Sequence, residues 1–356
     1  MGKTESGSVG DWAGKPHAEV KTLKAEINRL YKQLEKVKAG RGLIIEAVED
    51  IFKDEPPVIS PPARPKDTGK GTEEIAVVHI SDTQIGKVTK TYNPSVCRDR
   101  LHLLVEKVAQ ITELRRAGSK IEECHLYLGG DIVEGEDIFP GQSHEIEGGV
   151  FEQAVRSAPA MLVETVLGLM GIFDRVNILC VRGNHGRNSR FANKRTNWDS
   201  VVYRICELML LGPHAPPEVH NRLAMRVEDE TFWVVDRLWD WGNLVVHGDQ
   251  VRGGFAGLPW YGVSKKMAGW TDSIPEPWET LLFGHFHTPA QAVINHKMFL
   301  ANGTTESGNE FAQEQLAAAG CPAQRLAFWN EKHGLIADHI VWLDDRTPQR
   351  QRGKEW

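Results

Sequence analysis

Short apolar runs that favour β-strands alternate with segments of helical periodicity from residue 74 onward. The predicted strands are Ile75–Ile80, Cys124–Leu128, Val176–Val181, Asn243–Val246, Leu281–Phe283, Met298–Ala301, Arg325–Asn330 and Ala337–Leu343, and the predicted helices are Arg98–Arg116, Gly149–Phe173 and Ser200–Leu211. The strand–helix–strand order of the first half indicates a parallel sheet covered by helices. The last two runs, joined by a turn near Lys332–Gly334, predict a closing hairpin. We therefore expect an α/β protein whose second half is more antiparallel.

Five of these strands end in residue types that bind metal ions. The segments that follow them read Ser-Asp-Thr-Gln, Gly-Gly-Asp, Arg-Gly-Asn-His, His-Gly-Asp and Gly-His-Phe-His. Because ligands bind outside the carboxyl ends of strands in open α/β sheets, these side chains are expected to converge. One such residue alone is more often a turn or a helix cap. Five in order favour a metal centre, and mixed Asp, Asn and His ligands suit Mn²⁺, Zn²⁺ or Fe²⁺ better than Mg²⁺.

The combined series resembles the calcineurin-like metallophosphoesterase superfamily over residues 74–305, about two thirds of the chain. It comprises Asp82-x-Gln84, Gly130-Asp131, Gly183-Asn184-His185, Val246-His247-Gly248-Asp249 and Gly284-His285-x-His287. The resemblance implies a four-layer α/β/β/α sandwich with two divalent metal ions. Mn²⁺ is the expected metal, with Zn²⁺, Fe²⁺ or Mg²⁺ as alternatives. Two such ions about 3.5–4 Å apart activate a water molecule and bind phosphate oxygens.

The resemblance also implies a role for each matching residue. The first ion would be bound by Asp82, Gln84 and His287, and the second by Asn184, His247 and His285, with Asp131 bridging both. His185 would be the catalytic histidine, donating a proton to the leaving oxygen or stabilising the developing negative charge. His79 lies within a strand, with pleat parity opposite to that of Asp82, and is expected to be structural.

Two positions depart from the superfamily pattern. Gln84 stands where a histidine is usual, and its neutral amide oxygen is a weaker ligand for Zn²⁺ but acceptable to Mn²⁺. Gly186 stands where an acidic residue often follows the catalytic histidine. His185 must therefore be oriented by a group that the sequence does not identify.

Two stretches bear on the substrate. Arg182, Arg187, Arg190, Lys194 and Arg195 occur within fourteen residues that contain no acid, which favours a phosphate-binding rim over a solvated helix start. The second stretch, Arg252–Trp278, interleaves basic and aromatic residues. This pattern is typical of a surface that stacks on nucleobases, and a buried lid or a dimer contact can have it as well. The predicted substrate-binding residues are Arg187, Arg190, Arg252, Trp260 and Tyr261. Trp233, Trp239 and Trp241 are assigned to core or hairpin packing.

The first 73 residues have a different pattern. We expect a mobile segment at 1–16, a helix at 17–52, a Pro-rich linker at 53–73, the catalytic domain at 74–346 and a tail at 347–356. Apolar residues in the helix follow a heptad seam: Val20, Leu23, Ile27, Leu30, Leu34 and Val37. The helix could form a coiled coil in a homodimer or lie on its own domain.

Composition excludes several classes of protein. With 42 basic and 48 acidic residues the net charge is −6 and the pI about 6.2, which argues against a protein that coats nucleic acid through bulk charge. Metals can still neutralise phosphate in a nuclease. The five cysteines are dispersed and no signal peptide is visible, so a cytoplasmic location is expected. The apolar stretch Ala160–Phe173 is short and contains Glu164, so no membrane association is expected.

Three functions remain open for a metal-dependent phosphodiester hydrolase of this kind. The prediction is a nuclease that processes DNA, similar to the SbcD-type repair exonucleases, because of the basic rim, the aromatic stretch and the possible dimer helix. The acidic pI favours the alternative, a phosphodiesterase acting on cyclic nucleotides. The third is a recognition or scaffold protein with weakened catalysis, for which Gln84 and Gly186 are the evidence. The arrangement also resembles phosphoesterases carried by phages and prophages.

Overall fold

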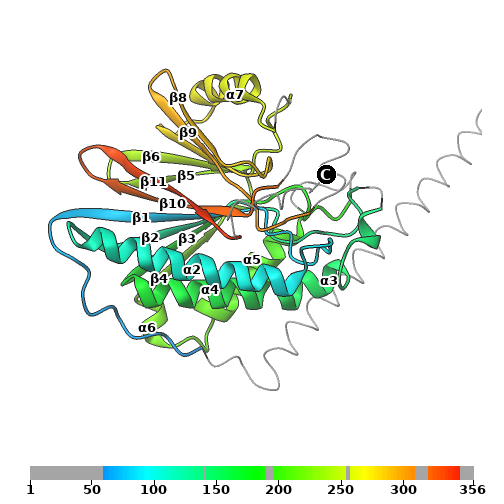
Figure 1. Ribbon diagram of the computed structural model, residues 1–356, viewed down its shortest axis with the longest axis horizontal. Helices are drawn as coiled ribbons and strands as arrows, with labels where there is room; N and C mark the ends of the chain where they lie inside the picture. The colour runs from blue at the N-terminus through cyan, green and yellow to red at the C-terminus, as the bar shows by residue number, and fades with distance from the viewer. Residues whose placement is uncertain (1–58, 140, 190–195, 254–256, 309–319, 345–356) are drawn as a thin grey trace, which may run out of the picture. The chain divides into compact units, whose positions relative to one another are not determined.

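The computed structural model describes residues 59–139, 141–189, 196–253, 257–308 and 320–344 (Figure 1). All of them belong to one unit, Pro57–Trp356. The predicted segments 1–16 and 17–52, the start of the linker, Arg190 and the tail 347–356 lie outside the described residues. The later part of the linker is attached to the domain, since Ile59 is buried in the core and the Pro62 carbonyl accepts a hydrogen bond from Arg222.

The first sheet has six strands in the order β11-β10-β1-β2-β3-β4. Its strands are β1 (Thr72–Ile80), β2 (Ser119–Leu128), β3 (Arg175–Cys180), β4 (Leu223–Val227), β10 (Ala323–Asn330) and β11 (Gly334–Trp342). Strands β1 to β4 are parallel, whereas β10 runs antiparallel to both β1 and β11. The predicted hairpin of β10 and β11 is confirmed.

Helices connect the parallel strands of this sheet. They are α2 (Pro94–Arg116), α3 (Val150–Glu152), a π-helical turn (Gln153–Ser157), α4 (Ala158–Ile172), α5 (Trp198–Leu211) and α6 (Pro217–His220), with a 3₁₀ turn at Gln142–His144. The helical stretch Val150–Ile172 is long and apolar enough to cross a membrane by length and composition. Its apolar side chains, among them Leu162, Val166 and Leu169, are buried in the core of the domain, as in the central helix of a globular fold.

The second sheet has five strands in the order β5-β6-β7-β9-β8. They are β5 (Trp233–Leu238), β6 (Trp241–Val246), β7 (Thr280–Phe283), β8 (Ala290–Ile294) and β9 (Lys297–Ala301), and α7 (Trp260–Ser273) lies between β6 and β7 in the chain. The central strands β6, β7 and β9 are parallel, and only the edge strands β5 and β8 are antiparallel. Both edge pairings of this sheet and both pairings of β10 are antiparallel, so the prediction of a more antiparallel second half is confirmed, although the centre of this sheet is parallel.

The two sheets pack face to face, with several helices on the outer side of the first sheet and α7 on the outer side of the second (Figure 1). One apolar cluster joins Val77 and Tyr127 of the first sheet to Val245 and Leu282 of the second. A second cluster lies between the first sheet and the helices α2, α4 and α5, and a third lies between the second sheet and α7. The predicted α/β fold is confirmed and contains two mixed sheets.

The sequence did not predict β4, β5, β8 or α7. In α7 the buried residues Val263, Met267 and Trp270 follow helical spacing. The aromatics at its start and the two lysines within it favoured a binding surface instead. Trp233 and Trp241 lie in the hairpin β5–β6, as their assignment to hairpin packing anticipated, and Trp239 lies in its turn with a φ of 53°.

Candidate metal centre

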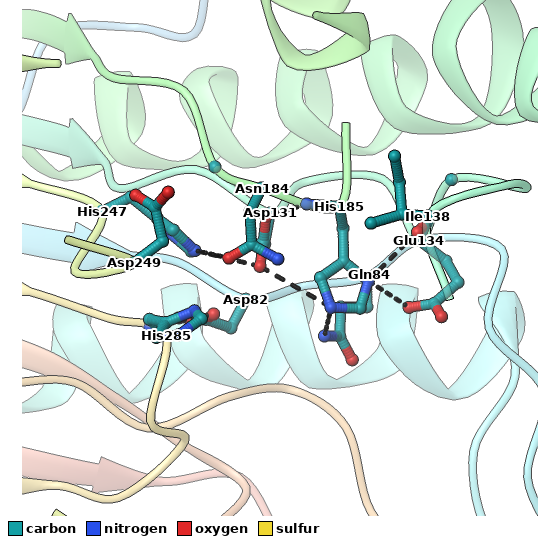
Figure 2. Close-up of polar contacts among 12 residues, drawn as sticks. Asp82, Gln84, Asp131, Glu134, Ile138, Asn184, His185, His247, Asp249 and His285 are labelled. Atoms are coloured by element: carbon teal, nitrogen blue, oxygen red, sulfur yellow. Dashed lines mark hydrogen bonds and ion pairs between the residues drawn. The ribbon is translucent and has the colours of Figure 1, made fainter. Parts of the chain in front are cut away.

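The predicted ligands converge at one edge where both sheets end (Figure 2). Asp82, Asp131 and Asn184 follow β1, β2 and β3 of the first sheet, while His247 and His285 follow β6 and β7 of the second. The face-to-face packing of the sheets brings these strand ends together, because the parallel strands of each sheet end on the same side. Residues that are far apart in the sequence thus form one site.

The turns that carry the site are conformationally strained. Five site residues have left-handed backbones: Asp82 (φ 54°), Gln84 (φ 43°), Asp131 (φ 52°), His285 (φ 69°) and His287 (φ 53°). Such a conformation costs about 1–3 kcal/mol for a residue other than glycine and persists where the surrounding structure enforces it. Only two further non-glycine residues in the described part of the chain have positive φ, so the strain is concentrated at the site.

One group of side chains is arranged as a metal site. The ligand atoms of Asp131, His247 and His285 lie within 4.8 Å of one another. His247 Nε2 is 3.0 Å from Asp131 Oδ2 and 3.1 Å from Asn184 Oδ1, and its Nδ1 is 2.9 Å from the Gly129 carbonyl. A ring nitrogen held by a carbonyl directs the other nitrogen toward a metal. This donor set fits a divalent cation such as Mn²⁺, Zn²⁺ or Fe²⁺.

The electrostatics of this group agree with a cation site. Burial acts to lower the pKa of His247, but the charge of Asp131 and its hydrogen bond outweigh burial and raise that pKa to about 10. The same negative charge would stabilise a bound cation. Burial and the charge of His247 lower the pKa of His285 to about 4, so this imidazole is neutral at pH 7 and has a lone pair to donate.

The residues predicted for the first ion also lie together. His287 Nε2 is 3.3 Å from Asp82 Oδ1, and the backbone N–H of His285 donates to both oxygens of Asp82. The amide nitrogen of Gln84 is 3.4 Å from Nε2 of both His185 and His287. Gln84 Oε1 is buried and has no hydrogen-bond partner among the described residues, so it is available as a ligand. These atoms fit a second cation, and the role of Gln84 stays a prediction.

His185 lies beside this group and is oriented by Glu134. Its Nδ1 is 3.1 Å from Glu134 Oε2 and 3.1 Å from the Glu134 carbonyl, and its Nε2 is 3.9 Å from Asp131 Oδ2. Burial acts to lower the pKa of His185, but the charges of Glu134 and Asp131 raise it to about 9. The imidazole is therefore protonated at neutral pH and can donate to an anion. Nothing in the sequence identified Glu134, which lies 51 residues away.

The structure explains the glycine that follows His185. A Cβ atom at Gly186 would lie 2.4 Å from Asn197 Oδ1 and 3.0 Å from the backbone nitrogen of Asp199. An acidic side chain has no room here, so Glu134 supplies the carboxylate from another loop.

Asp199 is a second residue that the sequence did not reveal. Its buried carboxylate accepts hydrogen bonds from the backbone N–H groups of Asp131 (3.0 Å), Ile132 (3.0 Å) and Gly183 (2.8 Å). It thereby joins the turns after β2 and β3. Burial and the charge of Asp131 raise its pKa to about 6. The sequence signal was an Asp at the start of a helix, which usually indicates helix capping only.

The structural role expected of His79 agrees with its burial within β1. Burial and the charge of Arg325 lower its pKa to about 3, so the imidazole stays neutral. Its ring nitrogens have no hydrogen-bond partner within the described ranges.

The predicted substrate-binding residues are placed less centrally. Arg182 donates to the backbone carbonyls of Asp229 and Thr231, and Arg187 pairs with Asp249. Arg252 is exposed. Trp260 and Tyr261 are exposed at the start of α7, with exposed fractions of 47% and 82%. Their substrate-binding role stays a prediction.

A cavity of about 390 Å³ opens next to His185. It is lined by Glu136, Asp137, Ser143, Val150, Arg187, Asn188 and Trp198. Glu136 and Asp137 follow Glu134 in its loop, and Arg187 and Asn188 follow His185, so the cavity lies near the site although neither Glu134 nor His185 is part of its lining.

The fold is similar to several solved structures at low sequence identity. Vacuolar protein sorting 29 from Cryptosporidium parvum is 17% identical with a TM-score of 0.34, and the match covers 76% of this chain and 98% of that chain. Vps29 from Entamoeba histolytica complexed with Zn²⁺ is 12% identical (TM-score 0.35; 76% and 99% covered). An archaeal phosphodiesterase is 9% identical (TM-score 0.33; 75% and 99% covered).

No protein-family model matches the sequence, and no curated protein matches it either. Because the structural similarities are weak, the chemistry of the site rests on its own residues.

Proposed function

We propose that this protein is a metal-dependent phosphodiester hydrolase of the calcineurin-like metallophosphoesterase type. One observation supports the proposal above the others: the candidate metal ligands Asp131, His247 and His285 adjoin His185, whose Nε2 lies 3.9 Å from Asp131 Oδ2 and whose Nδ1 faces Glu134. Hydrolysis of a phosphodiester requires ligands that bind a divalent cation and, beside them, a proton donor held in a fixed orientation. At Gly186 the scaffold alternative loses support, because Glu134 supplies His185 with a carboxylate from another loop.

The residues of the chain would divide the work as follows. When bound, divalent ions would polarise the phosphate and activate a water molecule. Asp82, Gln84 and His287 would hold one ion, Asn184, His247 and His285 the other, and Asp131 would bind both. Nδ1 of His185 stays on Glu134, so Nε2 can donate its proton to the leaving oxygen.

The proposed substrate is a nucleic acid, with DNA as the first candidate. This proposal rests on the sequence cluster of bases near His185 and on the exposed pair Trp260 and Tyr261. A small phosphodiester such as a cyclic nucleotide is the second candidate. The cavity near the His185 turn favours it, because Glu136 and Asp137 in the lining would repel a polyanion more strongly than a single phosphodiester. The same carboxylates can accept hydrogen bonds from the hydroxyl and amino groups of one nucleoside.

The first experiment measures hydrolysis of a chromogenic aryl phosphodiester, labelled linear DNA and a cyclic nucleotide, each with Mn²⁺ and with EDTA. Asp131→Asn should abolish hydrolysis and weaken metal binding. Asp174→Asn makes the same chemical change at a surface ion pair with Arg64 and should have no effect. Hydrolysis retained in Asp131→Asn would refute the assignment, and metal binding without hydrolysis of any diester would favour a recognition protein.

A further inference from the structure

A buried lysine lies behind the site, between two carboxylates. Lys87 Nζ is 3.1 Å from Glu306 Oε1 and 3.7 Å from Glu134 Oε1. The three side chains are at most 7% exposed. A lysine this deeply buried is rare, because removing its charge from water is costly unless the charge is paired.

Each carboxylate also lies within ion-pair distance of the Nδ1 atom of one histidine of the site, and His185 Nδ1 has the Glu134 backbone carbonyl at 3.1 Å as well. Glu134 Oε2 lies 3.1 Å from His185 Nδ1, and Glu306 Oε2 lies 3.4 Å from His287 Nδ1. The other nitrogen of each ring, Nε2, lies 3.4 Å from the Gln84 amide nitrogen. Six side chains therefore lie in a ring of neighbours, in the order Gln84, His185, Glu134, Lys87, Glu306 and His287, with 3.1–3.7 Å between successive polar atoms.

The ring gives Lys87 contact with two different functions. His185 is the proposed proton donor, and His287 is a proposed ligand of the first ion. Lys87 pairs with the two carboxylates and not with the histidines. Its effect on each imidazole therefore passes through the carboxylate beside that imidazole. Rotating either imidazole would break its contact with the carboxylate. Lys87 pairs with both carboxylates, and the Gln142 amide also donates to Glu134 Oε1 at 3.2 Å.

We propose that Lys87 is a positioning residue that sets the orientations of His185 and His287 together, acting through Glu134 and Glu306. Its consequence for turnover rests on the proposed function, whereas the orientation of the two imidazoles does not. A metal-ligating or proton-donating histidine whose carboxylate partner is disturbed typically loses 10–100-fold in metal affinity or activity. Loss of Lys87 should therefore weaken metal binding by His287 and proton donation by His185 at the same time.

The ring also accounts for Gln84 in this chain. An amide can face two imidazoles with either its NH₂ group or its oxygen, whereas a third imidazole offers only one nitrogen in that direction. Gln84 thus completes the ring as a neutral group between the two rings.

The test is NMR of the full chain without added metal, with ¹⁵N-labelled histidine. Protons on Nδ1 held by carboxylates give separate downfield signals, which His185→Gln and His287→Gln assign. Lys87→Met, which is similar in length and uncharged, should shift both signals. Lys87→Arg, which keeps the charge, should restore them at least in part. His125 supplies the internal control, because its Nδ1 lies 2.6 Å from Asp236 in a cluster that contains no ring residue, and its signal should not move.

Turnover provides the second measurement. With the chromogenic diester, Lys87→Met should lower kcat and weaken Mn²⁺ binding, each by about 10–100-fold, while KM changes little. Unchanged signals of His185 and His287, or a shift in only one of them, would overturn the proposal while leaving the hydrolase assignment intact. Absence of any hydrolase activity would refute the proposed function and leave the NMR test in force.

A second variant covers the case in which Lys87→Met does not fold. Lys87→Met/Glu306→Gln removes the lysine together with one of its two carboxylates, so less charge is left unpaired in the core. Compared with Glu306→Gln alone, the double variant should still shift the His185 signal. An identical His185 signal in the two proteins would refute the role of Lys87.

Discussion

Replacing His125 with glutamine tests how strongly one ion pair holds the two sheets together. His125 on β2 of the first sheet lies 2.6 Å from Asp236 on β5 of the second, and 3.0 Å from Glu123 on its own strand. Burial acts to lower the pKa of His125, but the hydrogen bonds to Asp236 and Glu123 raise it to about 9. The variant removes the charge. It leaves Asp236 with the Tyr127 hydroxyl at 2.6 Å.

The magnitude follows from the difference between the folded and unfolded pKa values. A rise from 6.5 to about 9 corresponds to about 3 kcal/mol at 1.36 kcal/mol per pKa unit. The pKa of Glu123 is lowered to about 2, chiefly by its hydrogen bond to His125. The two shifts describe one interaction, so their energies are not added.

The sign of the pH dependence is fixed by the direction of the shift. Because the folded-state pKa of His125 is raised, its stabilisation is fully present below pH 6.5 and is lost as the pH rises through about 9. His185, His247 and His287 also have raised pKa values and contribute to the same pH range. The difference between wild type and variant isolates His125.

Urea unfolding between pH 6 and 9.5 measures this difference. At pH 6 the free energy of unfolding of His125→Gln should be lower than that of wild type by about 3 kcal/mol, and the gap should narrow toward pH 9.5. His102→Gln, at a histidine whose side chain is 57% exposed, is the matched control and should leave stability unchanged at every pH. A gap between wild type and His125→Gln that is constant with pH would refute the reasoning.

Three further predictions concern the site. Asp199→Asn should lower the free energy of unfolding by about 2–4 kcal/mol and weaken metal binding, because the carboxylate joins two turns through four backbone donors. Urea unfolding and metal analysis test this, and unchanged values would contradict it. Gly186→Glu should destabilise the protein by about 1–3 kcal/mol because a Cβ there meets Asn197, and a thermal melt that is unaltered or raised would show that the turn has room. Gln84→His should increase Mn²⁺ or Zn²⁺ occupancy of the first site, and equal metal content in the two proteins would count against Gln84 as a ligand.

The sequence predicted the strands that carry the site because each is an apolar run closed by a polar turn. Asp82, Asp131 and His247 each follow such a strand, and strand ends of this kind meet in space whatever the intervening loops do. The supporting residues could not be predicted in the same way. Glu134 and Glu306 act through side chains whose direction depends on loop paths, and an isolated acid in a loop reads as a solvated residue.

The missed elements have a related explanation. In α7 the apolar residues have helical spacing, but the aromatic pair Trp260 and Tyr261 at its start favoured a substrate-binding surface over a helix. Both side chains are exposed in the structure. The edge strand β8 alternates between partly buried and exposed residues with few large apolar side chains, so its pattern is faint. The sequence around Lys87 gives no sign that this lysine is buried, and only the fold reveals the two carboxylates beside it.

The placement of the ligands on turns from both sheets has a consequence for how the chain folds. Asp82 and His285 are 203 residues apart in the sequence, so neither sheet alone contains the site. A cation bound there would close a very long loop, as a disulfide does, but reversibly and without a covalent bond. Binding selects chains in which both sheets have formed and docked, and the free energy of binding adds to the stability of that state alone. A bound metal ion would thus stabilise only those chains in which the two sheets are folded and docked.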